Sequence, residues 1–283
     1  MKISQITIDQ HFVPQCYLKQ FTNNDWKVFV YKKDGHLLNR KYSPRSILFK
    51  KLIYELNLKD PDNKIENFFK KIEDRYSILS KKLLSLQHPE DFNLSNDEQT
   101  HLLLFVLRVA LGNPSQHEHL HNKDFDNLRL RELEVNNLSD EDKRESIINL
   151  QEHNRQELPI SIEVAFQKEF LLELILKKKF IFFIVNETNI FLTSDNPVVQ
   201  WYENATWLFD WMPRFSDINY WVALSPYVYL KIIDQETDPN IKNLSLCCDK
   251  NWEIVKKHNQ LMFKQCKDFV YWNIKNYKIP YLS

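Results

Sequence analysis

The chain of 283 residues is 43% hydrophobic and 13% aromatic, which is typical of a folded globular protein and excludes a disordered one. Its 38 basic residues balance 38 acidic ones, so the protein lacks the overall positive charge of a non-specific DNA-binding protein, although a local basic patch is compatible with neutrality. Only 2 glycines are present, which excludes the glycine-rich phosphate loops of nucleotide-binding enzymes and kinases.

Sorting and redox signals indicate a cytoplasmic protein. Residues 1–12 lack the apolar core of a signal peptide. The longest apolar runs, at 102–107 and 180–185, are far shorter than the roughly 20 residues that span a bilayer, so we expect no membrane partner. The 4 cysteines form no CxxC pair for zinc or redox chemistry, which predicts reduced thiols.

The first elements are a strand and a long helix. Residues 26–33 alternate and end at Asp34-Gly35, which predicts a strand leading into a hairpin turn. After Asn63 a core-facing helix is predicted, because apolar residues recur in steps of four and three: Ile65, Phe69, Ile72, Tyr76, Leu79 and Leu83.

More helices are expected in the middle of the chain. Ser95 and Glu98 form a capping box that opens a helix running to Gly112. Further helices are predicted to begin near residues 113 and 139, and another covers 158–176.

The pattern changes at Lys179, where short β-branched and aromatic segments separated by turn residues predict strands. These segments lie at 180–185, 189–202, 219–226 and 227–234. A final helix is predicted from Asp249 to Tyr271, with one apolar face formed by Trp252, Val255, Met262, Cys266 and Phe269.

Together these elements predict an α+β fold: a helical body packed on one mainly antiparallel sheet, formed largely by the C-terminal half and closed by the C-terminal helix. The pattern leaves open whether the early hairpin joins this sheet. We expect a single domain over residues 1–283, because no repeat or flexible linker interrupts the chain. Its parts are an N-terminal segment with the hairpin (1–55), a helical part (56–178), the sheet (179–240) and the C-terminal helix (245–283).

His11 is the first candidate functional residue. Pro14 suits the first position of a helix with Tyr17, Leu18 and Phe21 facing inward, and this places His11 just before the helix N-terminus. The helix dipole there disfavours the imidazolium, which leaves a neutral ring able to accept a proton or bind a metal. The alternative is an inert His11 that packs under an anchored N-terminal segment.

A second candidate group follows the strand that ends at Thr193. Ser194, Asp195 and Asn196 precede Pro197, and short polar side chains at such a place can simply hydrogen-bond the turn. Alternatively, Asp195 is a ligand or general base held at the end of a strand.

Arg108 is the third candidate. Its helix is apolar nearly all round, and a guanidinium keeps its proton, so burial requires a carboxylate or phosphate partner. Glu66 and Glu73 flank the apolar stripe of the preceding helix, and either could form a structural ion pair with Arg108. Glu66 could instead pair with Lys70 on its own helix.

Two of these motifs resemble a known family. The start, His11-Phe-Val-Pro with Tyr17-Leu18 and Phe21, and the later Thr193-Ser-Asp-Asn-Pro197 resemble the uncharacterised, largely bacterial family called domain of unknown function 4238. That family is also similar in its glutamates, its helix arginine and a Leu-Ser-Pro after a strand, here Glu66, Glu73, Arg108 and Leu224-Ser225-Pro226. Thr-Pro usually follows the arginine, whereas this chain has Val109-Ala110. The resemblance implies no settled activity, but it suggests that His11, Asp195 and Asn196 belong to one site.

A competing motif is HEHLH at residues 117–121. In the HExxH pattern two histidines bind zinc and the glutamate acts as base, so His117, Glu118 and His121 would form a metalloprotease site. The segment is polar nearly all round and follows another helix, which instead favours a surface histidine cluster.

Residues 32–51 are basic, with aromatic residues interleaved. Such a segment can follow a phosphate backbone and stack bases, or it can be the solvated face of a hairpin.

The leading hypothesis is an intracellular hydrolase acting on nucleic acid, such as an RNA- or DNA-cutting toxin or phage-defence effector. His11 would be the base or a metal ligand, Asp195 a ligand or orienting carboxylate, and Asn196 a positioning group. Arg108 would contact phosphate or hold a glutamate, and Glu66 would complete an acidic cluster. A divalent metal is compatible with this set. The expected substrate contacts are Gln15, Tyr17, Ser194, Lys41 and Arg45.

A second hypothesis is a non-catalytic binding or regulatory domain whose polar motifs fasten the N-terminal segment to the sheet. The zinc protease is the third hypothesis.

Overall fold

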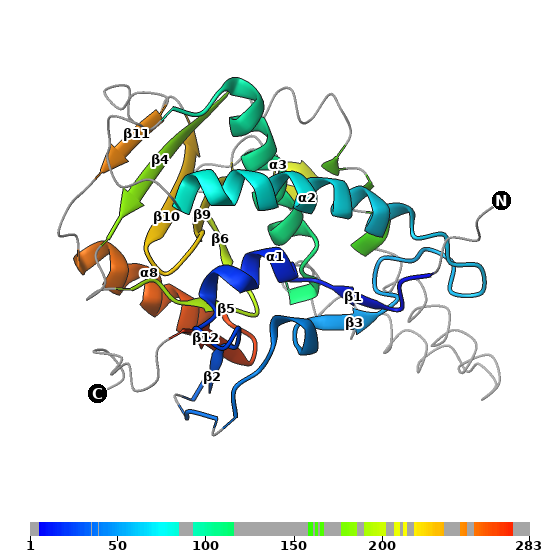
Figure 1. Cartoon of the computed structure of the whole chain (residues 1–283). Coiled ribbons are helices and arrows are strands. Elements are labelled where there is room, and N and C mark those ends of the chain that lie inside the picture. Colours follow the sequence, from blue (N-terminus) through cyan, green and yellow to red (C-terminus); the bar gives the residue numbers. More distant parts are fainter. Residues whose placement is uncertain are drawn as a thin grey trace, which may run out of the picture.

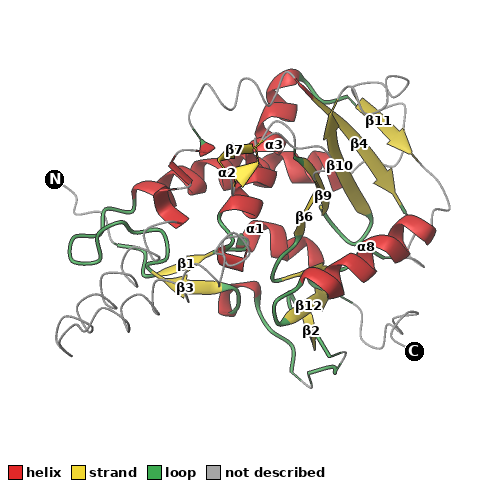
Figure 2. Cartoon of the chain, turned by 180° about the vertical axis from the view of Figure 1, so that it is seen from behind, coloured by secondary structure: helices red, strands yellow, loops and turns green. Residues whose placement is uncertain are grey.

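The structure is a computed structural model, which describes residues 6–34, 36–38, 40–84, 93–115, 158–160, 162–163, 165–166, 177–185, 190–201, 207–209, 212–213, 218–234, 244–247 and 252–273. Figure 1 shows helices α2 (Lys64–Leu84) and α3 (Asn96–Leu111) beside a five-stranded sheet, with helix α8 (Trp252–Gln265) near one end of its strands. The view from behind in Figure 2 shows the same arrangement.

The N-terminal segment consists of short elements. They are β1 (Asp9–His11), α1 (Gln15–Leu18), the 3₁₀ helix η1 (Lys19–Phe21), β2 (Phe29–Lys32), the 3₁₀ helix η2 (Pro44–Ser46) and β3 (Phe49–Lys51). Strand β1 pairs antiparallel with β3, so that His11 lies opposite Phe49. Tyr17, Leu18 and Phe21 are buried as predicted. The helix after Pro14 has only one α-helical turn, however, and its dipole is correspondingly small.

Helices α2 and α3 agree closely with their sequence signals. Every member of the predicted apolar stripe of α2 is buried. The Ser95 side chain accepts a hydrogen bond from the Glu98 backbone N–H, and the Glu98 carboxylate accepts one from the Ser95 N–H, which completes the predicted capping box of α3.

We expect Ser95→Ala to lower the free energy of unfolding by about 1 kcal/mol, because the first turn of α3 then loses its side-chain cap. Urea unfolding measures this change, and Asn93→Ala is a suitable control because Asn93 is exposed just before the helix. Equal midpoints for the two variants would contradict the assigned cap.

The main sheet comes from the C-terminal half, and it confirms the α+β class. Its strand order is β11-β4-β10-β9-β6, with antiparallel pairs except between β11 and β4. The strands are β4 (Lys178–Ile184), β6 (Val198–Trp201), β9 (Asn219–Ala223), β10 (Val228–Asp234) and β11 (Leu244–Cys247). Strands β7 (Trp207–Phe209) and β8 (Met212–Pro213) form a separate pair.

A second, three-stranded sheet has the order β2-β12-β5, where β5 is Thr193–Ser194 and β12 is Phe269–Trp272. The early hairpin therefore joins this sheet instead of the main one. The prediction of a helix up to Tyr271 is wrong beyond Gln265, because the chain turns and re-enters as β12. The Asp195 carboxylate accepts the backbone N–H groups of the intervening turn and of Phe269, which favours the turn over another helical turn.

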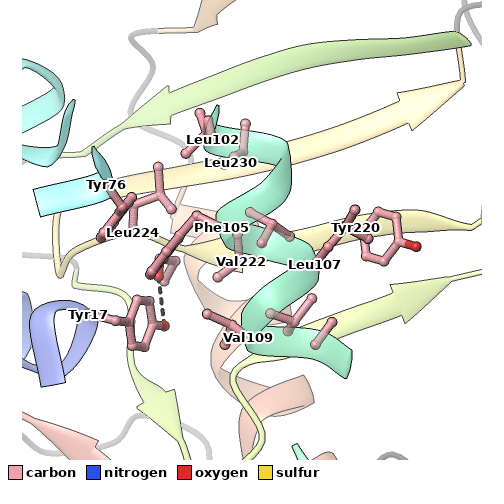
Figure 3. Packing of buried hydrophobic residues seen from close by; sticks show 14 of the residues in the cluster. Tyr17, Tyr76, Leu102, Phe105, Leu107, Val109, Tyr220, Val222, Leu224 and Leu230 are labelled. Atoms are coloured by element: carbon pink, nitrogen blue, oxygen red, sulfur yellow. Dashed lines mark hydrogen bonds between the residues drawn. The ribbon is translucent and has the colours of Figure 1, made fainter. Parts of the chain in front are cut away.

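The core lies between α3 and the main sheet. Figure 3 shows Leu107 and Val109 of α3 packed toward Val222 and Tyr220 of β9, with Tyr17 at the edge of the cluster. The hydrophobic cluster includes buried residues from the N-terminal segment, both long helices and the sheet, so these parts share one core.

Some predicted features lie wholly or mostly outside the described residues: the turn at Gly35, the helix expected from residue 139, all but the first residues of the helix expected from 113, and most of the helix at 158–176. Residues 158–160, 162–163 and 165 of that last segment are helical. Among the helices that the structure describes, none is long and apolar enough to cross a bilayer.

Candidate functional site

Arg108 is the centre of a buried polar cluster between α3, α2 and β1. Its side chain is 1% exposed, and its Nε and Nη2 atoms each lie 3.0 Å from Oε1 of Glu73. Nη2 also donates to the carbonyl oxygen of His11 at 2.6 Å, and the guanidinium lies 4.0 Å from the ring centroid of Phe69. The carboxylate partner that burial requires is therefore Glu73.

The end of α3 is shaped around this guanidinium. A Cβ atom at Gly112 would collide with Nη1 and the carbonyl oxygen of Arg108, so only glycine leaves the space that Arg108 occupies. Nη1 donates to the Tyr54 hydroxyl at 3.2 Å, and this hydroxyl in turn donates to the carbonyl of Gly112 at 2.7 Å. The absence of a side chain at Gly112 thus leaves room for the Arg108 guanidinium, and the Tyr54 hydroxyl connects the two residues by hydrogen bonds.

Glu66 lies near Arg108, and Glu55 lies near Glu66. Burial raises the pKa of Glu66 to about 7, since the attraction of Arg108 only partly offsets the desolvation. The Oε2 atom of Glu66 is buried and has no hydrogen-bond partner among the described residues. Glu55 is 2% exposed and accepts from Gln10, and from the backbone N–H groups that precede α2. Glu66 thus has a buried carboxylate oxygen that accepts no hydrogen bond from the described residues.

His11 is partly buried on the outer side of this cluster. Its Nε2 lies 3.3 Å from the Arg45 carbonyl oxygen, and its Nδ1 lies 3.4 Å from the Gln15 amide nitrogen. Burial lowers the pKa of His11, and the nearby charge of Arg108 acts in the same direction. Desolvation therefore disfavours the imidazolium form of His11 in the folded protein.

Asp195 lies in the turn after β5 and is 5% exposed. Its Oδ1 accepts the backbone N–H of Lys267 at 2.9 Å, and its Oδ2 accepts those of Asp268 and Phe269 at 2.7 and 3.0 Å. Burial raises the pKa of Asp195, and the three N–H donors act in the opposite direction. This carboxylate fixes the turn that leads into β12.

The neighbours of Asp195 also make internal hydrogen bonds. The Asn196 side chain donates to the carbonyl of Gln265 at 3.3 Å, and Ser194 Oγ accepts from the Asn196 backbone N–H at 3.1 Å. The Tyr17 hydroxyl donates to the carbonyl of Ala223 at 2.8 Å and so accepts from Thr193 Oγ1.

A hollow of about 350 Å³ opens between β3, the end of α3 and the turn before β12. Its walls are largely aromatic and aliphatic, and they carry two lysines and two acids. The residues that matter most for its chemistry are Phe12, Phe49, Lys50, Asp195, Lys267 and Asp268. His11 does not line the hollow, but its ring contacts that of Phe49, with centroids 5.4 Å apart.

The comparisons give a family for this arrangement. A family model described as "Protein of unknown function (DUF4238)" matches residues 9–276. The chain belongs to this family. No curated protein and no solved structure matches the chain. In this DUF4238 protein both motifs that carried the resemblance lie within the match, one in β1 and α1 and the other in β5 and the turn after it.

The end of α3 connects the two DUF4238 motifs. Arg108 binds the backbone carbonyl of His11, and the Asn113 side chain donates to the backbone carbonyl of Asp195 at 2.6 Å. The structure thus anchors both motif segments to one helix end, and it brings Asp195 and the neighbours of His11 to the same hollow. Arg108 faces protein groups, and Tyr17 is fully buried, so neither is exposed to a ligand in this state.

Other predicted site residues lie apart. Lys41 pairs with Asp25, with Nζ and Oδ2 2.7 Å apart, and Arg45 is exposed beside His11. HEHLH lies outside the described residues. Within the part of the chain that the structure describes, no three His, Cys, Asp or Glu side chains are placed to hold a metal ion.

Sequence reasoning missed Asn113, Glu55 and the lining residue Asp268. Asn113 carried a signal, because an asparagine directly before a proline at a helix end commonly hydrogen-bonds nearby backbone. Glu55 and Asp268 carried none, because their roles depend on pairing between distant segments.

Proposed function

We propose that this protein binds single-stranded nucleic acid across the hollow and the adjoining surface at His11, and that it hydrolyses the strand at His11, which acts as the general base. The observation that carries the proposal is the contact between the His11 ring, whose pKa is lowered by burial, and Phe49, which is a wall of the hollow. A neutral imidazole can take a proton from a water molecule whose oxygen attacks phosphorus and forms a new P–O bond. The bond from phosphorus to the leaving oxygen breaks, and solvent protonates that oxygen.

The surroundings support this substrate class. Aromatic side chains such as Phe12 and Phe49 offer surfaces on which bases stack, and Lys50 offers a positive charge for a phosphate. Exposed Arg45 and Lys51 extend the basic segment from the hollow. In this proposal Asp195, Asn196 and Arg108 hold the site together and do not contact the substrate.

We expect His11→Asn to lower the rate of cleavage by at least roughly 100-fold, because a positioned general base contributes about 10²–10⁴-fold. Binding and the melting temperature should change little, since Asn keeps a short polar side chain at this partly exposed position. The assay uses 5′-labelled 15-nucleotide RNA and DNA with Mg²⁺, Mn²⁺ or Zn²⁺, and Phe49→Ala should weaken binding in parallel. Wild-type protein that leaves both polymers intact would refute hydrolysis.

A non-catalytic binding domain is the second candidate. It is favoured by the observation that Asp195, Arg108 and Asn196 all make internal hydrogen bonds. Under this alternative the wild-type protein binds an oligonucleotide without cutting it, and His11→Asn lowers the melting temperature.

A further inference from the structure

The face of the main sheet that points away from α3 carries a group of aromatic and lysine side chains. Because side chains alternate along a strand, Val222 and Leu230 point toward α3, whereas Trp221 and Lys231 point to the other face. Trp221 on β9 lies directly opposite Lys231 on β10 in the register of the sheet. None of these side chains lines the hollow beside His11.

Their geometry is that of a stacking platform flanked by cations. The rings of Trp201 and Trp221 are parallel within 9°, with centroids 5.8 Å apart. The Lys231 ammonium lies 4.8 Å from the Trp221 centroid and 5.3 Å from that of Phe183. Trp201 is 46% exposed, so its ring is accessible at the end of β6.

Helix α8 extends this surface. His258 packs edge-on against Tyr229 at 4.8 Å and so fixes α8 over one end of the same face. From there Lys257 reaches toward Trp221, with its ammonium 5.7 Å from the ring centroid. The surface thus runs from α8 across Trp221 to Trp201.

The elements that form this surface contain more basic than acidic residues. Strands β4, β6, β9 and β10 and helix α8 contain six lysines and two acids. One acid, Asp234, is paired with Lys178 at 2.8 Å, and the other is the exposed Glu253. Lys178 and Lys179 are buried, so the local attraction for anions comes from the lysines of β10 and α8.

We propose that the surface formed by Trp201, Trp221, Lys231 and Lys257 binds single-stranded nucleic acid. Exposed Trp201 stacks a base, and the ammonium groups beside Trp221 contact the neighbouring phosphates. A duplex offers no free base face to Trp201, and a neutral sugar gains nothing from the ammonium groups. This surface is separate from the hollow, so the inference stands whether or not the hollow hydrolyses its ligand.

The test is the anisotropy of fluorescein-labelled 15-mers of dT and U, titrated with the full chain in EDTA. Trp201→Ala should weaken binding by at least roughly fivefold, as expected for the loss of one base stack, while Trp201→Phe retains most of the affinity. Lys257→Gln should reduce the slope of log affinity against log salt concentration by roughly 0.7, the value for one lost phosphate contact to a single strand. Ile78→Ala is the control, because Ile78 is 73% exposed on α2.

Equal dissociation constants for Trp201→Ala and wild type would overturn the proposal, as would binding of a neutral oligosaccharide instead of the oligonucleotides. The two proposals fail separately. Loss of binding in Trp201→Ala with no cleavage by wild type supports this surface and refutes hydrolysis. The opposite outcome has two parts: His11 but not Trp201 is needed to cleave a labelled trinucleotide, and Trp201→Ala binds the 15-mers as tightly as wild type does. This outcome refutes binding at the Trp201 surface and leaves hydrolysis at His11 standing.

Discussion

Arg108→Met is expected to lower the free energy of unfolding by about 3–5 kcal/mol, the usual cost of removing one partner of a buried ion pair. Methionine preserves much of the volume and can still pack on Phe69. The Glu73 carboxylate, however, loses its counter-ion, and the carbonyl of His11 loses its donor. Urea unfolding followed by tryptophan fluorescence measures the change.

Two further variants make the test specific. Arg75→Met makes the same substitution at an arginine of α2 whose side chain is 61% exposed, and it should cost less than about 1 kcal/mol. The double variant Arg108→Met with Glu73→Leu should recover much of the loss, because the carboxylate that lost its counter-ion is then removed as well. If the Arg108 and Arg75 variants shift the urea midpoint equally, the ion pair of Arg108 with Glu73 does not stabilise the fold as proposed.

Glu66→Gln is expected to stabilise the protein at pH 8 and to have little effect at pH 5. The pKa of Glu66 is raised from 4.5 to about 7, so between these values the folded state binds more protons than the unfolded state. The stability of the wild type therefore falls as the pH rises through this window. Above it, the folded protein holds an ionised carboxylate with an unpartnered buried oxygen.

The shift of the Glu66 pKa from 4.5 to about 7 corresponds to about 3–4 kcal/mol at roughly 1.4 kcal/mol per unit. Because Glu66 is partly exposed, we expect a gain of about 1–2 kcal/mol from the substitution at pH 8. Asp74→Asn, which replaces an exposed acid on the same helix by its amide, is the matched control. A Glu66→Gln gain that is equal at pH 5 and pH 8 would contradict the raised pKa.

The sequence predicts best where local signals agree with the tertiary structure. The apolar stripe of α2 and the capping box of α3 each lie within one element, and both are present. The final helix was extended too far because Met262, Cys266 and Phe269 keep a helical spacing across its end. The group that favours the turn is Asp195, which lies about 70 residues earlier and which no local pattern connects to that turn.

The candidate site was predictable as a set of residues, but the roles of those residues were not. An arginine on a helix that is apolar all round implied a buried carboxylate partner, and Glu73 was one of two candidates. Arg108 binds the carbonyl of His11 in β1, and β1 pairs with β3, from which α1 and β2 separate it along the chain, so no local sequence pattern reveals this arrangement. The hollow, likewise, is formed by segments around residues 12, 49, 114, 195 and 268, whose proximity only the fold creates.

The strand order of the three-stranded sheet determines how late this sheet can form while the chain is being synthesised. Its central strand, β12, pairs on one side with β2, which the ribosome makes roughly 240 residues earlier, and on the other with β5. Neither outer strand has a partner in this sheet until residue 272 has left the exit tunnel, and contacts this distant along a chain form slowly. The nascent protein should therefore keep one edge of β2 unpaired until β12 has emerged from the ribosome, and a chaperone that shields strand edges would raise its yield.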